Sequence, residues 1–165
     1  MTFIKNKNTL ILLIMGAVTV FYGGKYMSKP KLKYFKASEF GLWYPMMNND
    51  LLMKLDKFRE LWGDIVVISP VVGGLGRHGG EDNTSQHNVD KWGEVLAVDV
   101  FPTGMDNISE RRRAFAIAKS VGFTGIGLYT DTKPSNLLHV DVRKADKLAT
   151  WARVNGEYVG INQVV

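Results

Sequence analysis

The chain has 165 residues, of which 45% are hydrophobic and 22% charged, proportions that are typical of a globular domain and exclude wholesale disorder. It contains no cysteine, which excludes disulfide scaffolds, thiolate metal sites and cysteine nucleophiles. The net charge of +5 is unevenly distributed: residues 1–38 carry seven lysines and no acid, whereas 14 basic and 16 acidic residues follow from Glu39 onward. Because the body is mildly acidic, a nucleic-acid partner is not expected.

Residues 9–24 (TLILLIMGAVTVFYGG) form an uncharged, mostly apolar run with lysines on both sides. The run is short for a membrane-spanning helix, which needs about 20 residues. No small-x-small cleavage site follows it, so we expect residues 1–27 to form an apolar anchor helix that is not cleaved. A cleaved signal peptide, a buried helix and an assembly contact are the alternatives.

Residues 28–36 (SKPKLKYFK) are predicted to be a basic linker, and residues 37–165 one compact domain. Apolar residues recur about every 3.6 positions over residues 50–62, which predicts an amphipathic helix. A second helix is predicted to begin at Asn107 or Ser109 and to end near residue 121.

The remaining predicted elements are strands at residues 65–69, 95–101, 124–130 and 137–143, a short helix or turn at 144–153, and a hairpin turn at 154–157. Helices and strands do not alternate regularly along the chain. The sequence therefore predicts an α+β fold with a small, mostly antiparallel sheet and flanking helices.

Ionisable residues occur inside two of the apolar strands. Because strand side chains alternate, His139 and Asp141 share the face opposite to the valines of their strand, and Asp99 lies between valines in another strand. His87 follows a glycine-rich loop at residues 70–85. His87, Asp99 and His139 would supply three ligands to a catalytic zinc ion. The alternative is that they are ordinary hydrogen-bonded or ion-paired residues.

Two blocks of the sequence resemble a known family. The first contains Ser85-Gln86-His87, Gly93 and Ala97-Val98-Asp99-Val100, and is similar to the motif S-x-H … G-x-A-x-D-[IV]. The second contains GIGLY (125–129) and LHVDVR (138–143), and is similar to G-[IV]-G-x-Y … [FV]-H-[VI]-D-x-R. Both motifs belong to the superfamily of zinc D-Ala-D-Ala carboxypeptidases and L-Ala-D-Glu endopeptidases, which includes phage lysis and virion-associated members. The resemblance covers residues 65–151.

The resemblance implies a Zn²⁺ ion held by His87, Asp99 and His139. It also implies that Asp141 takes a proton from water and passes it to the leaving amine. Arg77 would neutralise a substrate carboxylate or the developing oxyanion, or would be a solvated loop residue. Ser85 would bind substrate or shape its turn.

The chain departs from the family pattern in two places. Asp99 follows His87 by twelve positions, a longer interval than in the family motif, and Asn136 stands where many members carry an acid. Large aromatics such as Trp151 either line a substrate groove or serve as packing.

The expected function is therefore a membrane-anchored zinc peptidase that cleaves peptidoglycan stem peptides, with its domain in the periplasm or cell envelope or associated with a virion. One alternative is a non-catalytic envelope or virion module that keeps the zinc fold. Another is an anchored helper that binds no metal.

Overall fold

The computed structural model describes residues 5–6, 9–14, 17–22 and 28–165. Near the N-terminus, β1 (Lys5–Asn6), β2 (Thr9–Ile14) and β3 (Ala17–Tyr22) form an antiparallel sheet. The expected anchor helix includes residues 15–16 and 23–24, which lie outside the described residues, so the expectation for the whole run stays a prediction. Within the described ranges, every helix is too short or too polar to span a bilayer.

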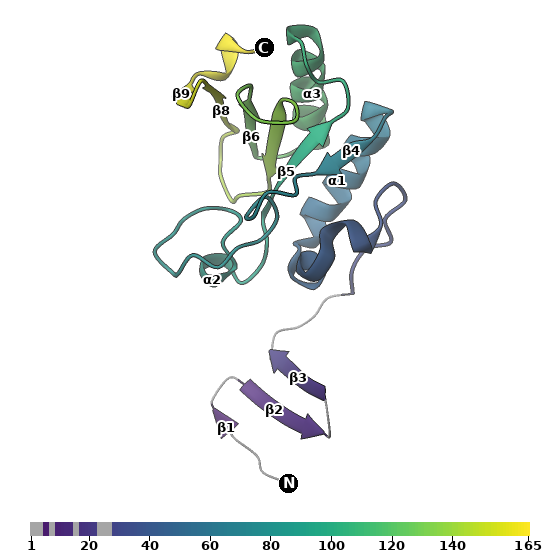
Figure 1. Cartoon of the computed structure of the whole chain (residues 1–165), viewed down its shortest axis with the longest axis vertical. Coiled ribbons are helices and arrows are strands. Elements are labelled where there is room, and N and C mark those ends of the chain that lie inside the picture. Colours follow the sequence, from purple (N-terminus) through teal and green to yellow (C-terminus); the bar gives the residue numbers. More distant parts are fainter. Residues whose placement is uncertain (1–4, 7–8, 15–16, 23–27) are drawn as a thin grey trace.

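A six-stranded sheet forms the centre of the body, with the strand order β4-β5-β7-β6-β8-β9 (Figure 1). Its strands are β4 (Val66–Ile68), β5 (Ala97–Pro102), β6 (Gly125–Tyr129), β7 (Leu137–Asp141), β8 (Ala149–Val154) and β9 (Glu157–Val159). Every neighbouring pair is antiparallel except β6 and β8, which are parallel. The predicted α+β class and mostly antiparallel sheet are confirmed.

The helical elements of the body are η1 (Ala37–Met46), α1 (Asn49–Trp62), α2 (Val89–Trp92), α3 (Ile108–Val121) and η2 (Ile161–Gln163). The side chain of Asn48 caps α1 and that of Asn107 caps α3, and each helix ends at a left-handed glycine, Gly63 or Gly122. These end signals are local, which explains why both long helices were predicted from the sequence.

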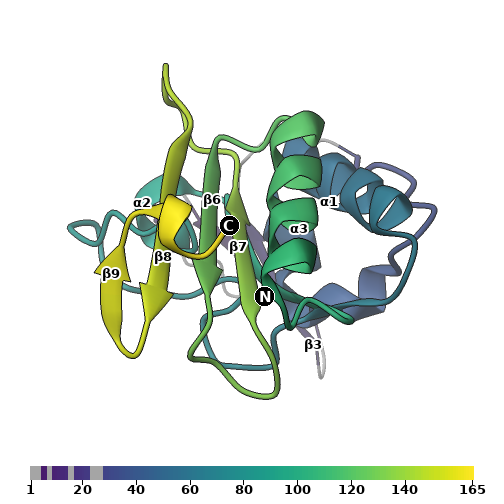
Figure 2. The ribbon, with the colours of Figure 1, turned by 90° about the horizontal axis from the view of Figure 1, so that it is seen from above.

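One face of the sheet packs into the apolar core together with α1 and α3, which lie side by side (Figure 2). The sheet contributes alternate strand residues to this core: Val98, Val100, Ile126, Leu128, Leu138 and Val140. The helices contribute residues that recur at helical spacing: Leu51, Leu52, Leu55, Phe58, Ala114 and Ala118. Because strand side chains alternate, the residues between these core positions lie on the opposite face of the sheet.

The prediction of a short helix or turn at residues 144–153 is wrong, because β8 occupies residues 149–154. Its pairing with β6 is parallel and joins residues far apart in the sequence, so no local pattern signals it. The predicted hairpin turn that follows is confirmed at Asn155 and Gly156, which have φ values of 51° and 87°.

The end of the predicted basic linker packs onto α1. The Asp56 carboxylate accepts backbone N–H bonds from Lys33, Tyr34 and Phe35 at 2.8–2.9 Å. The Phe35 side chain is buried in the core. The packed body therefore extends into the segment 28–36.

Candidate metal centre

The face of the sheet opposite the apolar core is here called the open face. Four residues on neighbouring strands form a row across this face, and two of them are candidate ligands. Asp99 on β5 pairs with His139 on β7, which pairs with Gly127 on β6, which pairs with Trp151 on β8. Neighbouring strands are about 4.8 Å apart, so side chains in one row that share a face lie within reach of one another. Two of the three predicted ligands are therefore brought together by the register of the strands.

The third predicted ligand, His87, reaches this row from the end of the glycine-rich loop. The long interval between His87 and Asp99 contains α2, a single helical turn that is capped by the Asn88 side chain and ended by the left-handed Gly93. The Trp92 side chain folds back and donates a hydrogen bond to the Ser85 carbonyl at 2.8 Å. The additional residues thus form a compact turn, and His87 and Asp99 still converge.

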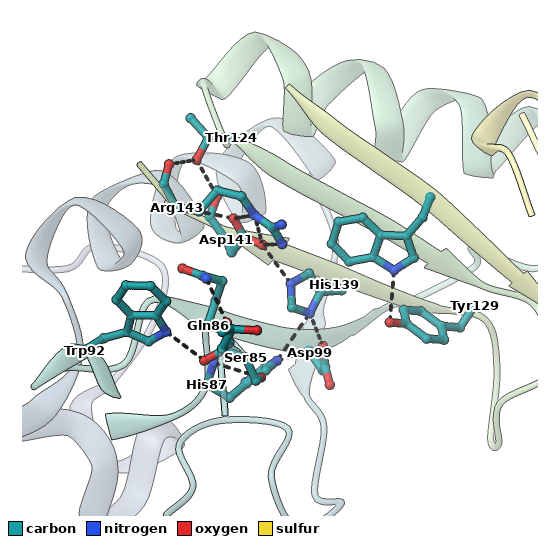
Figure 3. Close-up of polar contacts among 12 residues, drawn as sticks. Ser85, Gln86, His87, Trp92, Asp99, Thr124, Tyr129, His139, Asp141 and Arg143 are labelled. Atoms are coloured by element: carbon teal, nitrogen blue, oxygen red, sulfur yellow. Dashed lines mark hydrogen bonds and ion pairs between the residues drawn. The ribbon is translucent and has the colours of Figure 1, made fainter. Parts of the chain in front are cut away.

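The three ligand atoms lie close to one another in a largely buried position (Figure 3). His87 Nε2 is 3.2 Å from His139 Nδ1 and 3.5 Å from Asp99 Oδ1, and His139 Nδ1 is 2.8 Å from Asp99 Oδ1. The arrangement can hold a metal ion, because one ligand atom from each residue lies within 4.8 Å of the others.

The outer nitrogen of each imidazole is held by an acceptor. His87 Nδ1 bonds to the Leu75 carbonyl, which can only accept, so this nitrogen carries a proton and Nε2 presents a lone pair to the cluster. His139 Nε2 lies 3.0 Å from the Asp141 carboxylate, which leaves Nδ1 to face the cluster. Such outer hydrogen bonds fix the orientation and tautomer of metal-binding histidines.

This donor set fits a cation, because two imidazole lone pairs and a carboxylate oxygen are all acceptors and repel one another unless a proton or a metal ion lies between them. Burial lowers the pKa of His139, but hydrogen bonds to Asp141 and Asp99 outweigh it and raise that pKa above its ordinary value. Burial raises the pKa of Asp99, but hydrogen bonds from His139 and His87 outweigh it and hold that pKa well below the ordinary value.

Asp141 lies on the outer side of the His139 ring, away from the three ligand atoms (Figure 3). Its fully buried side chain accepts hydrogen bonds from Arg143 Nε at 2.9 and 3.0 Å. Burial acts to raise the pKa of Asp141, but the bonds from Arg143 and His139 lower it to about 2. Asp141 is therefore ionised at neutral pH and directed at His139.

Two glycines of β6 create the space that this arrangement needs. A Cβ on Gly125 would lie 2.1–2.4 Å from the Asp141 carboxyl group. A Cβ on Gly127 would lie 2.5–2.7 Å from the Trp151 indole, which packs against His139 with ring centroids 5.1 Å apart. In the GIGLY segment, Ile126 and Leu128 therefore belong to the core. Gly125 and Gly127 lie on the open face, where there is room only for a hydrogen atom in place of a side chain.

A cleft of about 700 Å³ opens over the cluster and is lined by all three ligand candidates. Arg77 and Ser85 also line it, with Arg77 Nη2 donating to Ser85 Oγ. Trp151 is a cleft residue too, whereas Asp141 is not. The structure therefore brings the predicted substrate-binding residues to the same cleft as the predicted ligands.

Asn136 does not line this cleft. It stands at the position where many members of the family that the chain resembles carry an acid. It is buried and donates a hydrogen bond to the Met105 carbonyl at 2.7 Å, so it has a structural contact.

Tyr129 also lines the cleft and accepts a hydrogen bond from Trp151 Nε1 at 3.0 Å, a role that the sequence did not predict. Tyr129 lies two residues after Gly127 in the same strand, so strand alternation puts both on the open face. This alternation is the sequence signal that could have identified Tyr129 as a cleft residue. The position of Trp151 had no such signal, because the strand that carries it was not predicted.

Comparisons of this chain with protein families, with curated proteins and with solved structures find no match.

Proposed function

We propose that this protein is a zinc-dependent peptidase that cleaves the stem peptides of peptidoglycan. The observation that carries the proposal is the convergence of His87, Asp99 and His139 in an open cleft. Two imidazoles and one carboxylate form a ligand set found in catalytic zinc sites, where a further position stays open to water or substrate.

The charge of the cleft supports an anionic substrate. Among the described residues, four basic residues and two acids line it: Arg77, Lys133, Arg143 and Arg153 against Asp99 and Asp131. Arg143 and Arg153 are ion-paired with Asp141 and Asp131, so Arg77 and Lys133 carry the positive charge that is offered to a substrate. This balance contrasts with the net negative charge of the chain from Glu39 onward. Stem peptides carry free carboxylates, which arginine and lysine side chains bind by charge-assisted hydrogen bonds. The choice of peptidoglycan among acidic peptides rests on the resemblance of the two sequence blocks.

When bound, a zinc ion supplies Lewis acidity that polarises a scissile carbonyl and lowers the pKa of water. The residues of the chain prepare its position: Asp99 contributes negative charge, and the outer hydrogen bonds of both histidines keep their lone pairs directed inward. The exposed Arg77 is available to neutralise a substrate carboxylate or a developing oxyanion, and its bond to Ser85 Oγ orients it.

For Asp141 the geometry supports an orienting role instead of the proton-accepting role expected from the sequence. Its carboxylate is buried outside the cleft and both oxygens bond to Arg143. In Asp141→Asn we expect zinc affinity to fall about 10–100-fold, with cleavage recovering when zinc is saturating. Cleavage that stays low at saturating zinc would instead support the proton-accepting role.

The test of the function combines metal analysis with mass spectrometry of digested muropeptides. We expect the full-length chain to bind one zinc ion and to shorten stem peptides at a single bond. Chelation of zinc should abolish the cleavage and its return should restore it. A chain that binds zinc but leaves every stem peptide intact would contradict the proposal.

A non-catalytic, envelope- or virion-associated module is the second candidate. The observation that favours it is the scarcity of proton acceptors. Within the part of the chain that the structure describes, Asp99 and Asp131 are the only carboxylates lining the cleft, and Asp131 is ion-paired with Arg153 at 3.0 Å. The same digestion separates the two candidates, because the module predicts zinc binding without product. We also propose that residues 1–27 anchor the domain to a membrane in the cell envelope.

A further inference from the structure

Tyr129 and Trp151 form a hydrogen-bonded pair in the cleft beside the metal centre. Trp151 contacts both His139 and Tyr129. Its ring packs against His139, and its Nε1–H donates to the Tyr129 hydroxyl oxygen at 3.0 Å. The sheet fixes this pair, because Trp151 faces Gly127 across β6 and β8, and Tyr129 lies two residues further along β6 on the same face.

The direction of the indole N–H determines what the phenol can do. A tyrosine hydroxyl has one proton to donate and accepts on its oxygen. Because Trp151 donates to the oxygen, the phenolic proton points away from the indole nitrogen. In Figure 3 the hydroxyl end of Tyr129 is directed toward the side of the cluster formed by His139 and Asp99.

We propose that the Tyr129 hydroxyl donates a hydrogen bond to the scissile carbonyl oxygen of a peptide in the cleft, and that Trp151 is the positioning residue that aims it. This inference rests on the proposed peptidase function. The proton stays on the phenol throughout, so Tyr129 stabilises the negative charge that develops on the oxygen.

The surroundings of the phenol suit a donor that stays protonated. Desolvation by burial is the largest cause that raises the pKa of Tyr129, to about 12. The hydrogen bond from Trp151 acts to lower this pKa, whereas the neighbouring Tyr158 and, last, the charge of Asp99 raise it further. The Arg153 guanidinium lies over the ring, 4.8 Å from its centroid, and is itself ion-paired with Asp131 at 3.0 Å. A donor held in place before substrate binds needs no reorganisation during the reaction.

The test uses the zinc-loaded full-length chain and the muropeptide that it cleaves. In Tyr129→Phe we expect kcat to fall about 100-fold or more, the usual loss when one oxyanion donor is removed. KM, zinc content and Tm should stay close to those of the wild type, because the phenyl ring keeps its packing and Tyr129 is not among the ligands. Tyr34→Phe is the matched control, since it removes a phenol that bonds to Glu60 on α1, away from the cleft, and should leave kcat unchanged.

Trp151→Phe tests the positioning role separately. It keeps an aromatic ring over Gly127 but removes the N–H that aims the phenol, so we expect kcat to fall less, about tenfold, with zinc still bound.

A wild-type kcat in Tyr129→Phe, a change confined to KM, or loss of zinc from that variant would overturn the inference and leave the peptidase proposal intact. Absence of cleavage by the zinc-loaded wild type would overturn both proposals.

Discussion

On β7, Leu138 and Val140 lie in the apolar core with almost no exposed surface, whereas His139 and Asp141 of the same strand lie among polar groups on the opposite face. The core face is held by packing that many apolar side chains share. The open face is held by a chain of specific hydrogen bonds, from Arg143 to Asp141 to His139. We therefore expect substitutions on the core face to lower the stability of the fold, and substitutions on the open face to lower the proposed zinc binding and peptide cleavage.

The largest expected effect comes from His139→Ala. This change removes one of the three ligands, so we expect zinc to be lost and cleavage to fall at least about a thousandfold, since a Lewis acid supplies several kcal/mol to the transition state. Elemental analysis and muropeptide digestion measure both quantities. A variant that keeps stoichiometric zinc would show that the cluster is not the metal site.

The neighbouring core residue should behave in the opposite way. In Leu138→Ala we expect the free energy of unfolding to fall by about 2–5 kcal/mol, because a fully buried side chain leaves a cavity. The folded fraction should still bind zinc at the wild-type ratio. Denaturant unfolding followed by metal analysis checks this. Loss of zinc from the folded protein would contradict the expectation that core substitutions affect stability alone.

An intermediate effect is expected where a glycine supports the open face. In Gly125→Ala the new methyl group meets the Asp141 carboxyl group, so Asp141 must move and release His139. We expect a loss of about 1–3 kcal/mol in stability and a zinc affinity about 10–100-fold lower. Gly160→Ala is the control: its Cβ meets no atom within 4 Å, and both properties should match the wild type.

The smallest expected effect is a pH dependence that comes from Tyr129. Its pKa in the folded chain is raised to about 12, chiefly by burial, from an ordinary value near 10. Its contribution to stability is therefore fully present below about pH 10 and is lost as the pH rises toward 12. Denaturant unfolding across this range should show a shallower decline in Tyr129→Phe than in the wild type, and parallel curves would contradict the assignment.

Part of the site could be predicted because its signals are local. The alternation of His139 and Asp141 with valines placed both on one face, and the two sequence blocks grouped His87, Asp99 and His139 as candidate ligands. The ends of α3 at Asn107 and Gly122 could also be predicted from the sequence, since capping depends on neighbouring residues.

The sequence by itself determined the fold class, the long helices, the faces of the strands and the identity of the candidate ligands, because these depend on periodicity and on short motifs. Only the tertiary structure decided which imidazole nitrogen faces the cluster and that Asp141 bonds to the outer one. It also decided that β8 pairs in parallel with β6 and brings Trp151 to Tyr129. Such contacts join residues distant along the chain, and no spacing in the sequence records which atoms meet.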